Sequence, residues 1–302
     1  MGAPVDSGVA RKLLLDVDVG CDDAVMTAMA LGAPDLEVVG VTTVAGNTTV
    51  ENTTDNALAV LELLDRTDVP VARGADRPIV DELHTAESIH GPDGLRGDMP
   101  APTAEPVDEH AARFLVEQVR EHEPTVVAVG PPTNLATALV LDPDLPEHAD
   151  GVYVMGGAAR VAGNRTPAAE ANFRNDPVAA RRVVADAEPY VVGLDATDDA
   201  TVPRSLVEQY RASEPPLRQV GAWLDYHDSI VHDAAVVADL LEDVLTYETH
   251  PMRVDTSEGP SRGALIADEN RVGDRPADGH LAVGIDTERF RETLRATVET
   301  FV

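Results

Sequence analysis

The segment LLLDVDVGCDDAVMTAMAL, residues 13–31, decides the fold of this chain. Its apolar opening predicts a buried strand, which ends near Asp16 and Asp18. Gly20 allows a turn, and helical periodicity follows from about Asp22 to Leu31. A strand that turns directly into a helix begins a βαβ unit. The segment therefore predicts an α/β fold with a mostly parallel sheet.

The same order of apolar run, turn and helix recurs along the chain. Apolar runs that end at turns containing glycine or proline cover Glu37 to Val44, Thr125 to Val129 and Gly151 to Met155, and a helix extends through Leu64 after the first of them. Ligands of open α/β sheets bind in the crevice at the carboxyl ends of the strands. These separate segments are therefore predicted to border one cleft.

The remaining segments fit a single Rossmann-like domain over residues 1–302, with its central sheet flanked by helices. A long loop from Ile89 to Pro106 precedes a helix from about Val107 to Arg120. After Val244 we expect a closing helix and short strands at the edge of the sheet, over Leu245 to Glu248, Gly263 to Ala267 and His280 to Ile285.

The charge of the chain is far from balanced. Its formal net charge is −31, from 54 acidic and 23 basic residues, and Lys12 is its single lysine. A nucleic acid would be repelled by this field, so we expect no nucleic-acid partner. Excess carboxylate with almost no lysine resembles proteins of extreme halophiles and favours a high-salt cytoplasm; an acidic protein of a mesophile is the alternative.

The single cysteine, Cys21, excludes a disulfide within the chain and a zinc site built from cysteines, and packing is its expected role. The first residues lack the apolar run of a signal peptide, and no later run is long enough to span a membrane. We therefore expect a cytoplasmic protein with no membrane partner.

Four carboxylates crowd the first turn, at Asp16, Asp18, Asp22 and Asp23. At the junction of a strand and a helix they repel one another unless a cation joins them, and a hard divalent ion is the simplest cation to do so. Asp22 and Asp23 also suit the first turn of a helix, where the helix dipole favours acidic residues. That alternative does not account for Asp16 and Asp18.

Residues 13–31 resemble the opening block of the inosine-uridine nucleoside hydrolase family, whose usual form is Asp-x-Asp-Pro-Gly-x-Asp-Asp. Later stretches resemble further blocks of the family in the same order: GVTTVAGNTTVENTTDNAL, IHGPDGL, VGPPTNLATAL, MGGAARVAGNRTPAAEANFRNDPVAA and IVHDAAVVA. The resemblance spans roughly residues 13 to 240 and is specific as a set. It implies a calcium-dependent enzyme that hydrolyses the N-glycosidic bond of nucleosides.

The resemblance also implies the metal ligands. Calcium would be held by Asp18, Asp23, the backbone carbonyl of Thr133 and Asp233, which are oxygen ligands of the kind that calcium accepts. Asp18 would contact both the ion and a water molecule. It is therefore the predicted general base, because the ion acidifies the water while the carboxylate takes the proton.

By the same resemblance, Asp22 and Asn47 would bind the ribose hydroxyls, and Asn164, Glu170 and Asn172 would hold the 3′ and 5′ hydroxyls. Cleavage of an N-glycosidic bond develops oxocarbenium character on the ribose, so nearby carboxylate and amide oxygens stabilise the transition state. Asparagines beside glycine or proline are also common as turn residues, which is the alternative for Asn164 and Asn172.

The departing base leaves more easily when it receives a proton. His232, directly before Asp233, matches a family histidine proposed as that acid, and histidine exchanges protons near neutral pH. His90 would line the pocket or order its loop. Trp223, Tyr226 and His227 are candidates to contact the base, with a place in the core as the alternative.

The chain departs from the family pattern at two positions of its motifs. Val19 replaces the usual proline, which removes a rigid ring but no ligand. Ala171 stands where many relatives carry a large hydrophobic or aromatic residue, so contacts to the substrate are predicted to be weaker there. Gly156 and Gly157 are interpreted as tight-turn residues outside the site.

Other functions remain open from the sequence. The same ribose site would suit another N-riboside, such as a nicotinamide or modified-base riboside, and a calcium-dependent nucleoside-binding protein without turnover is a further alternative. A metal-dependent phosphatase is disfavoured, since phosphate sites usually recruit lysine or arginine donors and the motifs hold no obvious lysine for the phosphate, as Lys12 precedes the strand. By analogy with the family we expect a homodimer or homotetramer.

Overall fold

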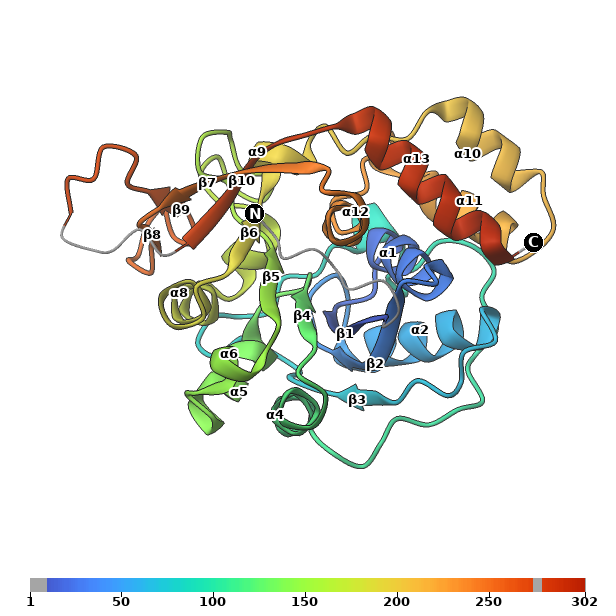
Figure 1. The fold of residues 1–302 in the computed structure, drawn as a ribbon, viewed down its shortest axis with the longest axis horizontal. Coiled ribbons are helices and arrows are strands. Elements are labelled where there is room, and N and C mark those ends of the chain that lie inside the picture. The colour runs from blue at the N-terminus through green and yellow to red at the C-terminus, as the bar shows by residue number, and fades with distance from the viewer. Residues whose placement is uncertain (1–9, 274–278, 302) are drawn as a thin grey trace.

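Strand β1 (Arg11–Val17) lies inside the sheet, between β2 (Leu36–Thr43) and β4 (Thr125–Ala128). The structure is a computed structural model that describes residues 10–273 and 279–301. Its main sheet has eight strands in the order β3-β2-β1-β4-β5-β6-β10-β7, and all neighbours pair in parallel except β10 and β7 (Figure 1). This confirms the predicted α/β fold. The other strands of the sheet are β3 (Val71–Arg73), β5 (Gly151–Met155), β6 (Tyr190–Val192), β7 (Leu245–His250) and β10 (Gly279–Ile285).

Successive residues of β1 point to opposite faces of the sheet, and helices cover both faces. Leu13 and Leu15 pack in one buried cluster and Leu14 in another, so the strand is apolar throughout rather than alternating. The first cluster includes residues of α1 (Cys21–Gly32), α2 (Val50–Leu63), α9 (Leu194–Thr197), α10 (Arg204–Arg211), α11 (Leu217–Leu224), α12 (Ala234–Glu242) and α13 (Thr287–Val298). The second includes residues of α4 (Ala111–His122), α5 (Thr133–Leu141), α6 (Leu145–His148), α7 (Ala171–Asn175) and α8 (Pro177–Asp186).

The long segment between β3 and α4 contains a short helix, α3 (Glu87–His90), which overlaps the start of the loop predicted from Ile89. Helix α4 starts at Ala111, later than the expected start near Val107. The ring of His110 accepts a hydrogen bond from the backbone N–H of Ala112, and this cap sets the start of the helix.

The C-terminal strands differ in part from the prediction. Strand β10 is not an edge strand, because it pairs in parallel with β6 on one side and antiparallel with β7 on the other. The expected edge strand from Gly263 to Ala267 is wrong as an edge of the main sheet. Its residues Leu265–Ala267 form β9, which pairs with β8 (Met252–Val254) in a separate two-stranded sheet. Pairing between distant strands is a tertiary property that apolar runs do not encode.

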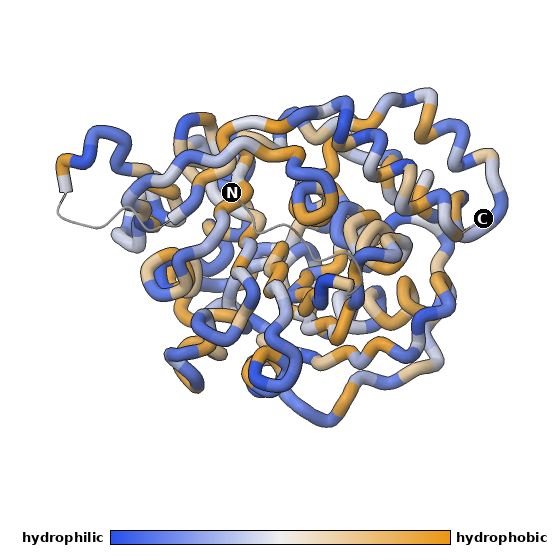
Figure 2. The backbone as a smooth tube through the Cα atoms, in the orientation of Figure 1, coloured by the Kyte–Doolittle hydropathy of each residue, from blue (hydrophilic) through white to orange (hydrophobic). Residues whose placement is uncertain are grey.

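Hydrophobic segments gather in the central strands and on the inner sides of the helices, while hydrophilic segments follow the outside (Figure 2). Within the described ranges, none of the helices has the length and apolar character that crossing a bilayer requires. The two ends of the expected domain, at residues 1–9 and 302, lie outside the described residues.

Candidate active site

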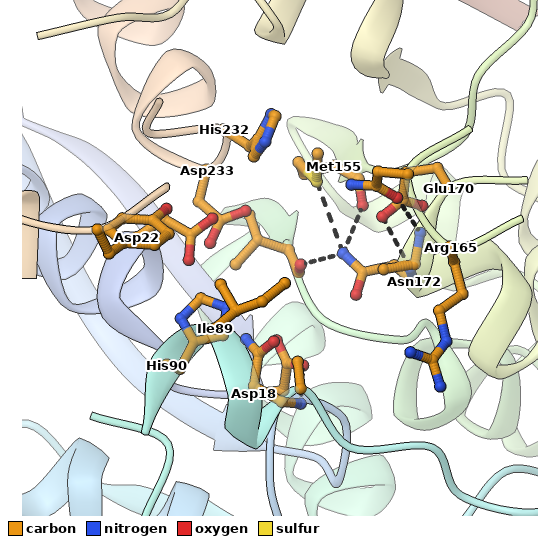
Figure 3. Close-up of a pocket in the computed structure, with 16 residues that line it drawn as sticks. Asp18, Asp22, Ile89, His90, Met155, Arg165, Glu170, Asn172, His232 and Asp233 are labelled. Carbon is orange, nitrogen blue, oxygen red and sulfur yellow. Dashed lines mark hydrogen bonds between the residues drawn. The ribbon is translucent and has the colours of Figure 1, made fainter. Parts of the chain in front are cut away.

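A cavity of about 150 Å³ opens at the carboxyl ends of the central parallel strands (Figure 3). Its wall brings together side chains that lie more than two hundred residues apart in the sequence. Of the residues predicted from the sequence, those that line it are Asp18, Asp22, Asn47, His90, Asn164, Glu170, Asn172, His232 and Asp233, together with Tyr226 from the candidates to contact the base. The strand ends therefore converge on one cleft, as the order of runs and turns predicted.

A cluster of buried carboxylates forms one side of the cavity. Carboxylate oxygens of Asp22, Asp23 and Asp233 lie within 4.8 Å of one another, although Asp233 comes from the start of α12 and the others from α1. The exposed fractions of Asp23 and Asp18 are 0% and 2%, so water does not screen their charges. The sequence assigned Asp22 to the ribose, and the structure places it inside this cluster.

Hydrogen bonds from the surrounding backbone fix Asp18 and Asp23. The carboxylate of Asp23 accepts from the N–H of Asp18 at 3.1 Å and from the N–H of Gly20 at 2.8 Å. The N–H of Asn47 donates to Oδ2 of Asp18 at 2.6 Å, and its side-chain amide donates to Asp23 at 3.4 Å. Gly46 is required beside them, because a Cβ there would lie 2.1 Å from Oδ2 of Asp18.

Burial shifts the ionisation of this cluster. It raises the pKa of Asp23 from 3.8 to about 6, and the charge of Asp22 adds to the effect. Burial and neighbouring carboxylates likewise raise the pKa values of Asp18 and Asp233 well above their ordinary range. Like charges at this spacing cannot all ionise without a counter-charge. The cluster therefore attracts a cation.

The donor set fits a hard divalent ion. Buried carboxylate oxygens that converge within 4.8 Å are the ligands that calcium takes, whereas nitrogen and sulfur donors that would favour zinc are not part of this group. Thr133, the first residue of α5, is not among the residues that line the cavity. Its carbonyl accepts a hydrogen bond from Oγ1 of Thr137 at 2.8 Å, and its role as a ligand remains a prediction.

A second buried carboxylate network lies directly beneath the cluster. Oδ1 of Asp16 accepts from Thr42 Oγ1 at 2.7 Å and from Asn134 Nδ2 at 2.8 Å. Asn134 also donates to the carbonyl of Thr43 and accepts from the N–H of Ala75. Burial raises the pKa of Asp16 to about 6. The aspartate thus ties β1 to β2 and to the start of α5, a role that the motif did not reveal.

The opposite side of the cavity is built around Glu170 and Asn172. Glu170 caps α7: its carboxylate accepts from the N–H of Asn172 at 2.8 Å and from the N–H of Gly157 at 2.9 Å. The amide of Asn172 donates to the carbonyls of Val129 at 2.6 Å and Met155 at 3.2 Å, as the dashed lines in Figure 3 show. Gly157, with φ 85°, therefore positions a site residue, which its interpretation as a plain turn residue did not anticipate.

The loop before α7 closes this side. Oδ1 of Asn164 accepts a hydrogen bond from the N–H of Ala171 at 3.0 Å, which leaves its amide group to donate elsewhere. Arg165 and Ala171 also line the cavity. The sequence predicted weaker substrate contacts at Ala171, but it did not assign Arg165 to the site. The only signal for Arg165 was its place next to Asn164 in the same block.

His232 borders the cavity from above Asp233 (Figure 3). Its Nδ1 lies 2.8 Å from the hydroxyl oxygen of Thr197, at the end of α9. This hydrogen bond fixes the ring at the border of the cavity. Thr197 carries no sequence signal, because only the packing of α9 on the sheet brings it to the histidine.

His90, Ile89 and Tyr226 form an aromatic and apolar wall. Nδ1 of His90 accepts a hydrogen bond from the N–H of Cys21 at 3.1 Å, and its ring centroid lies 5.3 Å from that of Tyr226. Burial, with the charge of Asp22, raises the pKa of Tyr226 well above its usual value, so the phenol stays neutral.

The other aromatic candidates, Trp223 and His227, and the thiol of Cys21 have separate outcomes. Trp223 is fully buried in the core and is not part of the cavity, so its alternative interpretation as a core residue is confirmed. The side chain of His227 lies outside what the structure describes. Cys21 is buried, and burial raises the pKa of its thiol to about 12, which agrees with a packing role.

Comparisons with known proteins identify the family of the chain. The family model for inosine-uridine preferring nucleoside hydrolases matches residues 13–292. The chain belongs to this family. It is therefore a nucleoside hydrolase, an enzyme that cleaves the N-glycosidic bond of nucleosides.

Relatives of this nucleoside hydrolase cover nearly its whole length. It is 35% identical over 305 residues to the pyrimidine-specific ribonucleoside hydrolase RihA of Shewanella sp. (strain ANA-3), with 95% of both chains covered. It is 36% identical to the probable uridine nucleosidase 2 of Arabidopsis thaliana, with 87% of both covered. Among solved structures, it matches the plant nucleoside hydrolase PpNRh1 with a TM-score of 0.88 at 32% identity, over 95% of this chain and 99% of that one. It also matches the purine-preferring ribonucleoside hydrolase of Gardnerella vaginalis with a TM-score of 0.89 at 29% identity, over 96% and 99%.

Proposed function

We propose that this enzyme hydrolyses pyrimidine ribonucleosides to ribose and the free base with a bound calcium ion. The carboxylate cluster of Asp22, Asp23 and Asp233 beside Asp18 carries the proposal, because it supplies oxygen ligands at the base of a sugar-sized cavity. Relatives named as pyrimidine-specific hydrolases and as a uridine nucleosidase support the choice of base.

In the proposed reaction, Asp18 accepts the proton of the attacking water. Calcium, when bound, lowers the pKa of a water molecule and binds the vicinal hydroxyls of the ribose. Its ligands would be Asp18, Asp23, the Thr133 carbonyl and Asp233. The positive charge of a bound ion would favour the ionised form of each carboxylate and so offset the upward pKa shifts that burial causes. Hydrogen bonds from Asn47 and Gly20 hold the carboxylates of Asp18 and Asp23 in place.

The ribose lies between the two sides of the cavity. We assign its 2′ and 3′ hydroxyls to Asp22 and Asn47, and its 3′ and 5′ hydroxyls to Asn164, Glu170 and Asn172. Because the amide group of Asn172 donates to two carbonyls, its oxygen is the atom that accepts from the sugar. The oxygen-rich walls stabilise the positive charge that develops on the ribose as the glycosidic bond breaks.

The departing base lies against His232 and the wall of Ile89, His90 and Tyr226. His232 donates a proton from Nε2, the ring nitrogen on the side away from Thr197. The neutral ring of Tyr226 and the side chain of Ile89 offer an apolar surface to the flat face of the base.

The proposal extends to the setting of the enzyme. The charge of −31 with a single lysine supports a high-salt cytoplasm, where screening reduces the repulsion among surface carboxylates. A homodimer or homotetramer is proposed by analogy with the family.

The test is a panel of uridine, cytidine, inosine and adenosine, assayed for ribose release with calcium at several salt concentrations. We expect the pyrimidine ribosides to react fastest, and a chelator to stop the reaction until calcium is added back. In the same assay, Asp18→Asn should abolish ribose release. Asp35→Asn, which makes the same change in an exposed turn, is its matched control. Faster release from inosine would overturn the choice of base, and turnover that survives chelation would overturn the choice of cofactor.

A further inference from the structure

The base-facing wall of the cavity is made of two loops that do not belong to the sheet. Ile89 and His90 lie in α3, and Tyr226 follows α11. Figure 3 shows Ile89 and His90 across the cavity from Glu170 and Asn172, the side assigned to the sugar. The relative position of the two loops therefore determines the shape of the base site.

Arg96 bridges these two loops. Its Nε and one terminal nitrogen donate to the carbonyl of Ile89 at 3.0 and 2.6 Å, and its other terminal nitrogen donates to the carbonyl of Asp225 at 3.4 Å. One guanidinium thus joins the carbonyl directly before His90 to the carbonyl directly before Tyr226. The planar fork of arginine holds its donors at fixed positions for two acceptors, whereas the ammonium of lysine is a compact charge without such a fork.

Tyr226 lies at the junction of two cavities. It lines the active-site cavity, and it also lines a second, more open cavity together with Arg96, Arg204 and Asp225. Its side chain is buried in the core, and the preceding Asp225 forms ion pairs with Arg204 and Arg211, so the Arg96 bridge sets how this anchored loop meets the Ile89–His90 segment.

The backbone after Tyr226 does not fix the loop by its own preferences. Asp228 and Ser229 both have left-handed backbone conformations, with φ values of 57° and 58°, which side-chain-bearing residues adopt only when contacts impose them. Such contacts come from Val202, whose N–H donates to the carbonyl of Ser229 at 2.9 Å, and from the Arg96 bridge on the other side of the tyrosine.

The rest of the Arg96 loop is anchored without the guanidinium. Asn56 donates to the carbonyl of Asp93 at 2.8 Å, Gln219 donates to the carbonyl of Asp98 at 2.8 Å, and Leu95 is buried in the core. Arg96 itself is exposed. Substitution of Arg96 is therefore expected to release the bridge while the loop and the fold persist.

We propose that Arg96 is a positioning residue for the base, which acts by holding the Ile89–His90 loop against the Asp225–Tyr226 loop. This inference rests on the proposed function, since it places the base at that wall. Arg96 donates to the carbonyls of Ile89 and Asp225 rather than to the residues assigned to the sugar and the metal.

The first test compares Arg96→Ala with the wild-type enzyme and with Arg113→Ala, a control at an exposed position of α4. Loss of hydrogen bonds from a charged donor predicts that KM for uridine rises about tenfold in Arg96→Ala. The wall contacts the base in both ground and transition states, so kcat should stay within about threefold. The inhibition constant of free ribose, which lacks a base, should not change. A KM within twofold of wild type, or a parallel rise in the ribose constant, would overturn the proposal.

Two further measurements separate this inference from the proposed function. In hydrogen exchange with no substrate present, amides of residues 86–91 and 225–230 should exchange faster in Arg96→Ala, while those of α4 stay unchanged. If these amides exchange at the same rate in Arg96→Ala as in the wild-type enzyme, the proposed bridge is contradicted. Arg96→Lys should recover less than half of the lost affinity, and full recovery would show that charge alone suffices. Absence of uridine hydrolysis by the wild-type enzyme would instead contradict the proposed function.

Discussion

The two sides of the active site are built in different ways. The carboxylate side places Asp18 and Asp23 where a central strand passes directly into a buried helix, and backbone N–H groups hold both carboxylates. The base-facing side rests on the loops that carry His90 and Tyr226, which are joined to each other by one exposed arginine. In the proposed function, the first side carries the reaction chemistry and the second the choice of base. Metal ligands must be held at fixed positions, which rigid strands and helices provide. A surface that selects a base can lie on loops, because loops tolerate changes in sequence.

Breaking the carboxylate side should have the largest effect. Asp18→Asn removes the general base and one proposed ligand, so turnover of uridine should fall by about 10³-fold or more while the fold is retained. An assay of ribose release checks the loss of turnover, and circular dichroism checks that the fold is retained. Asp35→Asn should behave as wild type, and undiminished hydrolysis by Asp18→Asn would refute its assignment as the base.

The next largest effect tests the histidine that lies between the two sides. His232→Ala should slow uridine hydrolysis by about 10²-fold, because the base must then leave without a proton. A nitrophenyl riboside, whose leaving group needs no proton, should lose far less. Equal losses on the two substrates would remove His232 from the acid role.

The carboxylate side also predicts how stability depends on pH. In the chelated protein, burial raises the pKa of Asp23 from 3.8 to about 6, so the folded state binds its proton more tightly than the unfolded state does. The stabilisation from this proton is complete below pH 3.8 and is lost as the pH rises through 6, which amounts to roughly 3 kcal/mol. The Tm of the chelated enzyme should therefore fall between about pH 4 and pH 6. The raised pKa values of Asp18 and Asp233 carry the decline further toward pH 7.

The Tm of the enzyme with calcium is the comparison for the Tm of the chelated enzyme. Calcium should raise Tm most at pH 7, where the carboxylates of Asp18, Asp23 and Asp233 are otherwise forced to ionise together. Asp233→Asn, with one carboxylate fewer, should show a smaller decline with pH. A Tm of the chelated enzyme that stays level or rises toward pH 7 would contradict the proposed repulsion.

The smallest effect is expected where the sugar side meets the solvent. Ala171 lines the cavity with a methyl group, so Ala171→Phe adds a ring that can cover the ribose. We expect KM for uridine to fall about threefold with kcat unchanged. Steady-state kinetics checks this, and a higher KM would show that the ring fills space that the substrate needs.

Sequence reasoning reached the fold and most of the carboxylate side for a local reason. Asp18, Asp22 and Asp23 lie within one strand–turn–helix unit, and the rule that parallel strands end at the same edge brings other segments to them. His232 and Asp233 required the family resemblance, since nothing in the local pattern says where a helix start near the C-terminus will lie. The structure places both at the cavity.

The sequence by itself determined the alternation of strands and helices, the acidic turn and the kind of chemistry that such a turn supports, because these depend on neighbours along the chain. Tertiary structure alone decided which distant groups support the site. Asn134 reaches Asp16, Thr197 reaches His232 and Arg96 spans two loops only because the helices and loops pack at particular positions on the sheet. Such contacts join residues far apart in sequence, and their geometry follows from packing rather than from local periodicity.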